Sequence, residues 1–163
     1  MRHLAGLARL SLSRPRAALT ALALAALALA GLPAASAGQT PTTVAVTGLD
    51  YAFQAPDTVK AGPVMLTFAN HGTVRHEVVL VLLKEGRTLG DLVRAATPEE
   101  RREVYEGGAV FGILIAMPGQ RSLGRLAVDL APGRTYVLLC NFRDAPEKPP
   151  HTTLGMIKGL YAK

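Results

Sequence analysis

Three side chains that bind soft metal ions, those of Cys140, His151 and Met156, lie close together near the C-terminus of the chain. One thiolate, two imidazoles and a distant thioether form the ligand set of a mononuclear blue copper site, because sulfur suits Cu(I) and imidazole suits both oxidation states. The C-terminal stretch supplies all of these ligands except one imidazole. The sequence therefore predicts a copper site that takes its second histidine from an earlier part of the chain.

The candidates for this upstream ligand are His71 and His76. His71 lies in a turn over residues 70–73, where a solvated histidine is common, whereas His76 lies near the start of an apolar strand over residues 74–83. We therefore predict that His76 is the ligand, with His71 as the alternative. Because side chains alternate along a strand, an inward His76 turns Glu77 outward.

Cys140 is the only cysteine of the chain, so it cannot form an internal disulfide. A buried thiol that behaves as a small hydrophobic side chain is the simple alternative. Taken singly, His151 also fits a surface loop and Met156 a core position. Their joint placement after Cys140 favours metal ligation, with His151 on the solvent side of the site.

The order of the four residues, His76 followed much later by Cys140, His151 and Met156, resembles that of the cupredoxins, the small copper proteins of the plastocyanin and azurin type. The resemblance extends over residues 42–163. It implies a Greek-key β-sandwich and one copper ion, cycling between Cu(I) and Cu(II), bound by these four side chains. It also implies an electron carrier and not an enzyme.

Two features depart from the family pattern. Cys140 and His151 are farther apart than in the best-known members, but lengthening a link from three to ten residues costs only about 1 kcal/mol. Glu77 stands where the family usually has an asparagine, which can brace the ligand loop by hydrogen bonding. A carboxylate beside a copper thiolate is unfavourable, so we expect Glu77 to lie outside the site.

Short β-strands separated by turns predict an all-β fold, a cupredoxin-like Greek-key sandwich. A helical insertion around residues 88–106 interrupts the strands, because Thr97 and Glu100 can form a capping box with Pro98 at the first helical position. The predicted strands are residues 44–53, interrupted or bulged at Gly48, and residues 64–69, 74–83, 122–130, 134–140 and 155–162. Residues 109–117 are either a further strand or a buried connection.

The last three strands position the C-terminal ligands. A turn over residues 131–133 predicts that residues 122–130 and 134–140 form a hairpin, which places Cys140 at a strand end. A closing strand over residues 155–162 beside the Cys140 strand then brings the loop ligands to one pole of the sandwich.

The first 37 residues predict a cleaved secretory signal peptide. They contain four arginines, no acidic residue, an apolar run over residues 17–32 and small residues at positions 35–37. An uncleaved anchor is the alternative, but a membrane span needs about 20 apolar residues and this run is shorter. We therefore expect a cupredoxin-like domain over residues 38–163, located in the periplasm or secreted.

The charge distribution argues against nucleic-acid binding. The chain has a formal net charge of +6, but four of its 18 Lys and Arg and none of its 12 Asp and Glu lie in residues 1–37, so 14 cationic residues remain against 12 acidic ones. These cationic residues are dispersed and not clustered with aromatics. A phosphate-binding loop is also unsupported, because no Lys and Ser/Thr follow Gly107-Gly108.

The main hypothesis is an exported, monomeric one-electron carrier. It implies a redox partner protein, with peripheral association with a membrane respiratory chain as one setting. The second hypothesis is a copper-binding or delivery module that does not shuttle electrons, and the third is a metal-free cupredoxin-like interaction domain. Visible absorption, reversible reduction and copper stoichiometry separate the three.

Overall fold

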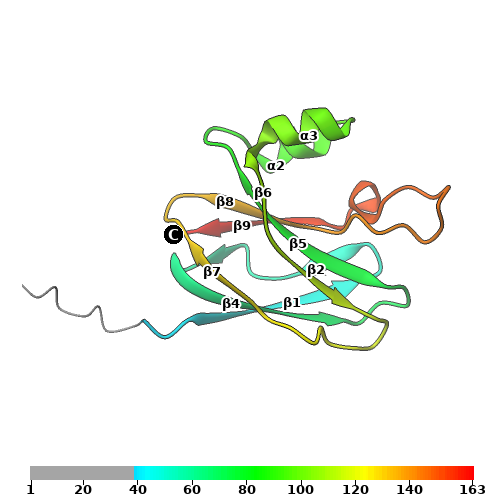
Figure 1. Cartoon of the computed structure of the whole chain (residues 1–163), viewed down its shortest axis with the longest axis horizontal. Helices are drawn as coiled ribbons and strands as arrows, with labels where there is room; N and C mark the ends of the chain where they lie inside the picture. Colours follow the sequence, from blue (N-terminus) through cyan, green and yellow to red (C-terminus); the bar gives the residue numbers. More distant parts are fainter. Residues whose placement is uncertain (1–38) are drawn as a thin grey trace, which may run out of the picture. The chain divides into compact units, whose positions relative to one another are not determined.

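Two β-sheets form the part of the chain that the computed structural model describes, residues 39–163 (Figure 1). The first sheet has the strand order β2-β1-β4-β7 and the second the order β3-β9-β8-β5-β6. This confirms the predicted all-β sandwich, whereas the predicted signal peptide lies outside the described residues. The strands are β1 (Thr42–Leu49), β2 (Ala52–Gln54), β3 (Thr58–Val59), β4 (Gly62–Asn70), β5 (His76–Leu83), β6 (Tyr105–Ala116), β7 (Leu126–Leu130), β8 (Thr135–Leu139) and β9 (Ile157–Ala162).

The first sheet buries one face. Strand β1 runs parallel to β4, and β4 pairs with β7 in the antiparallel direction. Along β4, buried side chains alternate with partly buried ones, as expected for a sheet with only one face on the core. Its inward side chains and those of β1 pack against the second sheet, and they include Val44, Val46, Val64, Leu66 and Phe68.

The second sheet is covered on both faces around its interior strand β5, in which every residue is buried. Val78 and Leu80 face the first sheet, whereas Val79 and Val81 belong to a second apolar cluster that includes Leu92 and further residues of the helical insertion. Figure 1 shows the two helices lying over this side of the sheet. Strand β5 is therefore a core strand without an exposed face.

The helical insertion consists of α2 (Leu89–Arg94) and α3 (Pro98–Val104). Thr97 and Glu100 form the predicted capping box at the start of α3, with Pro98 in the first turn. A second capping box, between Thr88 and Asp91, starts α2 and was not predicted. No helix within residues 39–163 has the length and apolar character required to cross a membrane.

The predicted hairpin before Cys140 is wrong. Strand β7 pairs with β4 in the first sheet, whereas β8 pairs with β5 and β9 in the second. The segment over residues 131–133 therefore connects the two sheets. The burial patterns explain the difference, because β8 is buried on both faces and requires a central position, while the half-exposed β7 can occupy an edge.

The predicted strand over residues 44–53 is interrupted, but after Leu49 and not at Gly48. It turns at Asp50 and Tyr51, so that β1 and β2 form an antiparallel hairpin in which Gly48 pairs with Phe53. Gly48 is therefore an ordinary ladder position and not a bulge. The turn brings Asp50 and Tyr51 to the end of the sandwich where β5 begins and β8 ends.

Candidate metal centre

The side chains of His76, Cys140 and His151 meet at this end of the sandwich. The two Nδ1 atoms lie 3.1 Å apart, and Cys140 Sγ lies 3.9 Å from His76 Nδ1 and 3.4 Å from His151 Nδ1. All three residues are buried, with at most 1% of their surface exposed. They form a group of side chains that can hold one metal ion.

The separations fit a single ion bound by two nitrogens and one sulfur. Metal–nitrogen bonds of about 2.0 Å and metal–sulfur bonds of about 2.3 Å at angles of about 105–120° place the ligand atoms roughly 3.2–3.8 Å apart. The observed distances lie within about 0.1 Å of this range. Among first-row metals, one thiolate and two imidazoles with a weak axial sulfur are characteristic of copper.

Hydrogen bonds on the far side of both imidazoles fix their tautomers. Nε2 of His151 lies 2.9 Å from Asp144 Oδ1, and Nε2 of His76 lies 3.3 Å from Asp50 Oδ1. Hydrogen bonds from Tyr51 and Thr73 hold the pKa values of Asp144 and Asp50, respectively, below their usual range, so both carboxylates accept. A neutral histidine that donates through Nε2 has a lone pair at Nδ1. The two facing Nδ1 atoms are thus arranged for a cation and not for each other.

The β1–β2 turn contacts both histidines. Asp50 is the partner of His76, and the Tyr51 hydroxyl donates to Asp144 Oδ2 at 2.6 Å. The Tyr51 ring also lies edge-on to His151, with ring centroids 5.1 Å apart. Tyr51 is the only non-glycine residue in the described part of the chain with positive φ, at 63°, an uncommon conformation for a bulky side chain. Its contacts with Asp144 and His151 offset this backbone strain.

Asn70 positions the segment that leads to His76. Its side-chain amide donates to the carbonyls of Val74 and Ala116, at 2.8 and 3.1 Å, and its oxygen accepts from the Gly72 amide at 2.8 Å. Gly72 has ordinary φ but little room, because a Cβ at this position would lie 2.3 Å from Asp50 Oδ1 and 3.0 Å from His76 Nε2. The glycine therefore permits the contact between Asp50 and His76.

Backbone hydrogen bonds hold the C-terminal ligand loop. The His151 amide donates to the Phe142 carbonyl at 2.8 Å, and the Met156 amide donates to the His151 carbonyl at 3.0 Å. The Cys140 amide donates to the Met156 carbonyl at 3.2 Å, so the loop closes on itself at its two ends. The side chain of Met156 is fully buried, and its methyl group lies beside Gly48 in β1.

Glu77 does not lie outside the site, contrary to our prediction. Alternation turns its side chain away from His76, but it is only 7% exposed. Its carboxylate accepts from the Asn141 amide at 3.0 Å, and its own amide donates to Cys140 Sγ at 3.4 Å. Glu77 therefore braces the start of the ligand loop by hydrogen bonding, the role that sequence reasoning assigned to an asparagine.

Burial controls the protonation of this centre in the absence of a metal. Burial raises the pKa of the Cys140 thiol, although the Glu77 and Phe142 amides partly counteract it. Burial also lowers the pKa of His76, against the raising effect of Asp50, so its imidazole stays neutral. A metal ion that binds here must therefore displace the thiol proton, whereas its imidazole ligand at His76 is already deprotonated.

The structure distinguishes the positions of the three histidines His71, His76 and His151. His76 lies in the cluster, and the alternative His71 is exposed and lies outside it. The prediction that His151 faces solvent is wrong, because Tyr51 and Asp144 cover it. Sequence reasoning missed both covering residues as well as Asp50. Asp144 lies within the long loop, but neither its spacing nor its type distinguishes it from the other polar residues there.

Comparisons with known proteins concern the fold. Among solved structures, the chain is similar to auracyanin B, with 23% identity and a TM-score of 0.50 over 77% of this chain and 92% of that one. It is also similar to auracyanin A, a "blue" copper protein from Chloroflexus aurantiacus, with 19% identity and a TM-score of 0.48 over 76% of this chain and 100% of that one. A scan of family models and a search of curated protein sequences found no match. The likeness to auracyanin B shows that the chain has the cupredoxin fold, as predicted.

Proposed function

We propose that this protein is an exported one-electron carrier with a type 1 copper site. In this proposal His76, Cys140, His151 and Met156 would hold the copper ion. Bound copper supplies the Cu(I)/Cu(II) couple. The observation that carries the proposal is the convergence of two Nδ1 lone pairs and one buried thiol, with both Nε2 atoms directed at carboxylates.

The residues around the centre support electron transfer more than copper delivery. Delivery requires that a partner reach the ligands, whereas His76, Cys140 and His151 are at most 1% exposed. Their outer hydrogen bonds hold the imidazoles in one orientation, and such outer partners typically contribute 10–100-fold in metal affinity. A centre that keeps its geometry in both oxidation states needs little rearrangement when an electron enters or leaves.

Export rests on the predicted signal peptide over residues 1–37, and an exported location agrees with a single cysteine reserved for a metal. We propose that the processed chain is located in the periplasm or secreted, and that it is a monomer that exchanges electrons with a partner protein. Peripheral association with a membrane respiratory chain is one setting for that exchange.

Copper titration of the purified protein followed by voltammetry tests the proposal. We expect one equivalent of copper per chain and a reversible one-electron wave. Tight binding of Cu(I) without a reversible wave would support delivery instead. Preferential binding of Zn²⁺, which also accepts Cys and His ligands, or no stoichiometric metal would contradict a copper carrier.

A further inference from the structure

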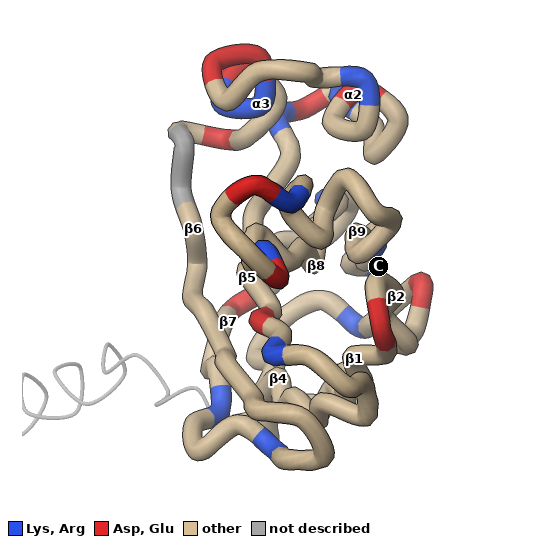
Figure 2. The backbone as a smooth tube through the Cα atoms, turned by 90° about the vertical axis from the view of Figure 1, so that its right-hand side faces the viewer, with Lys and Arg blue, Asp and Glu red and all other residues tan. Residues whose placement is uncertain are grey.

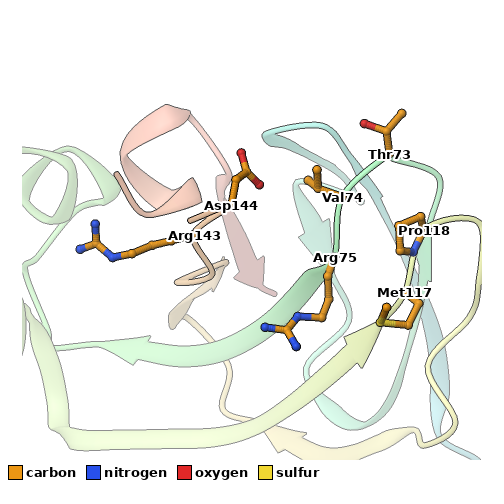
Figure 3. A pocket seen from close by; sticks show the side chains of 7 residues that line it. All are labelled: Thr73, Val74, Arg75, Met117, Pro118, Arg143 and Asp144. Atoms are coloured by element: carbon orange, nitrogen blue, oxygen red, sulfur yellow. The ribbon is translucent and has the colours of Figure 1, made fainter. Parts of the chain in front are cut away.

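A surface pocket of about 400 Å³ lies next to the metal centre. Figure 3 shows its side chains, which come from the segment before β5, the turn after β6 and the loop after β8. Because the histidine and cysteine ligands are buried, an electron that enters or leaves must pass through the residues that cover them. The residues that line the pocket are Thr73, Val74, Arg75, Met117, Pro118, Arg143 and Asp144.

The pocket is connected directly to the proposed ligands. Asp144 lines it and also accepts from His151 Nε2 at 2.9 Å. Arg75 precedes His76 in the chain, and its guanidinium lies 4.1 Å from the centre of the Phe142 ring. The Phe142 carbonyl in turn accepts from the His151 amide at 2.8 Å. A molecule in this pocket is therefore one hydrogen bond from a copper ligand.

The side chains that line the pocket carry a net positive charge, because they include two arginines and one carboxylate. Arg75 and Arg143 are exposed, and within residues 39–163 neither makes an ion pair with a carboxylate. Arg143 donates to the Lys148 carbonyl. Asp144 is the one carboxylate among the residues that line the pocket, and it accepts hydrogen bonds from Tyr51 and His151. Two arginines thus remain free to meet the carboxylates of a partner.

An apolar face continues from the pocket along β6, the edge strand of the second sheet. Ile113, Ile115 and Met117 point outward and are 52%, 49% and 50% exposed. Figure 2 shows that β6 carries charge only near its start, at Glu106. Apolar surface bordered by arginines is typical of an interface, where charge steers the encounter and apolar contacts complete it.

We propose that this pocket and the outward face of β6 form the docking site for a redox partner protein with an acidic surface. The proposal rests on the electron-carrier function proposed above and names the partner's chemistry. Carboxylates of the partner pair with Arg75 and Arg143, and its apolar residues cover Ile115 and Met117. Electrons then pass between the partner and the copper centre by way of Asp144 or Phe142.

Binding of cytochrome b5, an acidic haem protein, tests the site by NMR with the copper-free and the Cu(I)-loaded protein. We expect chemical-shift changes at the backbone amides of Thr73, Arg75, Ile115, Met117 and Arg143, and their loss at high salt. Changes confined to another face would overturn the proposal. Equal binding of inorganic phosphate in the pocket, without shifts from the haem protein, would show a small-anion site and overturn it as well.

Electron transfer from reduced cytochrome b5 to the Cu(II) protein provides the second test. The double variant Arg75→Gln/Arg143→Gln should lower the bimolecular rate constant at low ionic strength by on the order of tenfold. The matched control Arg87→Gln/Arg125→Gln removes two exposed arginines that do not line this pocket, and it should change the rate less than twofold. Equal losses in both pairs would contradict a specific site.

The visible spectrum must stay unchanged in the pocket variant, which shows that its copper centre is intact. A wild-type protein that takes up no copper would contradict the proposed function. In that case the NMR experiment with the copper-free protein still decides whether the pocket binds an acidic partner, so the two failures are distinguishable.

Discussion

His76 Nδ1 and His151 Nδ1 lie 3.1 Å apart while the Nε2 atom of each ring faces a carboxylate. Two lone pairs therefore converge in a buried space that also contains the Cys140 thiol. This arrangement is costly without a cation, because neither ring can donate to the other unless it loses its carboxylate partner. The preformed site therefore lowers the stability of the metal-free fold, and binding of a metal offsets this free-energy cost.

The metal-free protein should lose stability as the pH falls below about 6.5, the ordinary pKa of histidine. Burial lowers the pKa of His76 in the folded state, so the unfolded chain binds more protons in this range and the free energy of unfolding decreases. Urea unfolding at several pH values measures the slope. His76→Gln should reduce the slope, whereas His71→Gln should leave it unchanged; an unchanged slope in His76→Gln would contradict this cause.

Separate replacement of His76 and His71 tests which of the two upstream histidines is a copper ligand. His76→Ala should remove the copper–thiolate absorption and weaken copper binding by more than the roughly 10–100-fold cost of losing an outer-shell partner. His71→Ala should leave both nearly unchanged, because His71 is exposed and lies outside the cluster. Titration of copper followed by visible absorption measures both. Loss with His71→Ala and survival with His76→Ala would reverse the assignment.

The contribution of the Asp144 carboxylate, which accepts from His151, can be tested by substitutions within its own loop. Asp144→Ala leaves the His151 Nε2 and the Tyr51 hydroxyl without their acceptor, and copper affinity should fall about 10–100-fold. Asp144→Asn retains an acceptor oxygen and should lose less. Glu147→Ala removes an exposed carboxylate from the same loop and serves as the control; an equal loss in this variant would show that only loop charge matters.

The buried carboxylate of Glu77 should lower the reduction potential of the centre, because a negative charge near the thiolate favours the more positive Cu(II) state. Burial raises the pKa of Glu77, so the effect applies at a pH above that raised value. Glu77→Gln keeps an acceptor for the Asn141 amide and removes the charge. Voltammetry should show an increase of roughly 50–100 mV, equivalent to about 1–2 kcal/mol for one electron. A decrease would contradict a charged Glu77.

The same substitution should also stabilise the metal-free fold at neutral pH. A raised carboxyl pKa means that the folded state loses stability as the pH rises through that value, and the penalty is absent below the unfolded value of 4.5. The difference in unfolding free energy between Glu77→Gln and the wild type should therefore disappear in acid.

Local patterns predicted the parts of the site that lie close together in sequence. Cys140, His151 and Met156 share one loop, and the spacing of Thr97 and Glu100 marked a helix start. Pairing between distant strands could not be predicted in the same way, because the segment over residues 131–133 can turn within one sheet or connect two. That choice depends on burial on both faces of β8, which is set by tertiary packing.

The covering residues were missed for a related reason. Asp50 and Tyr51 contact the histidines only after β1 and β2 fold into a hairpin. Tyr51 and Asp144 are hydrogen-bonded although they are 93 positions apart in the sequence. The place of Glu77 was mispredicted because strand alternation specifies a face of the sheet but not which loops pack against that face.

Visible absorption of the Cu(II)-loaded protein, with and without the Cys140 thiol, is the decisive measurement for a copper–thiolate centre. We expect one equivalent of copper with an intense thiolate-to-copper band in the wild type, and loss of that band in Cys140→Ser, because a hydroxyl is a poor ligand for this soft site. Circular dichroism should show that the variant keeps its β-sandwich. A band that survives in Cys140→Ser, or a stoichiometric but colourless Cu(II) complex of the wild type, would contradict a copper–thiolate centre.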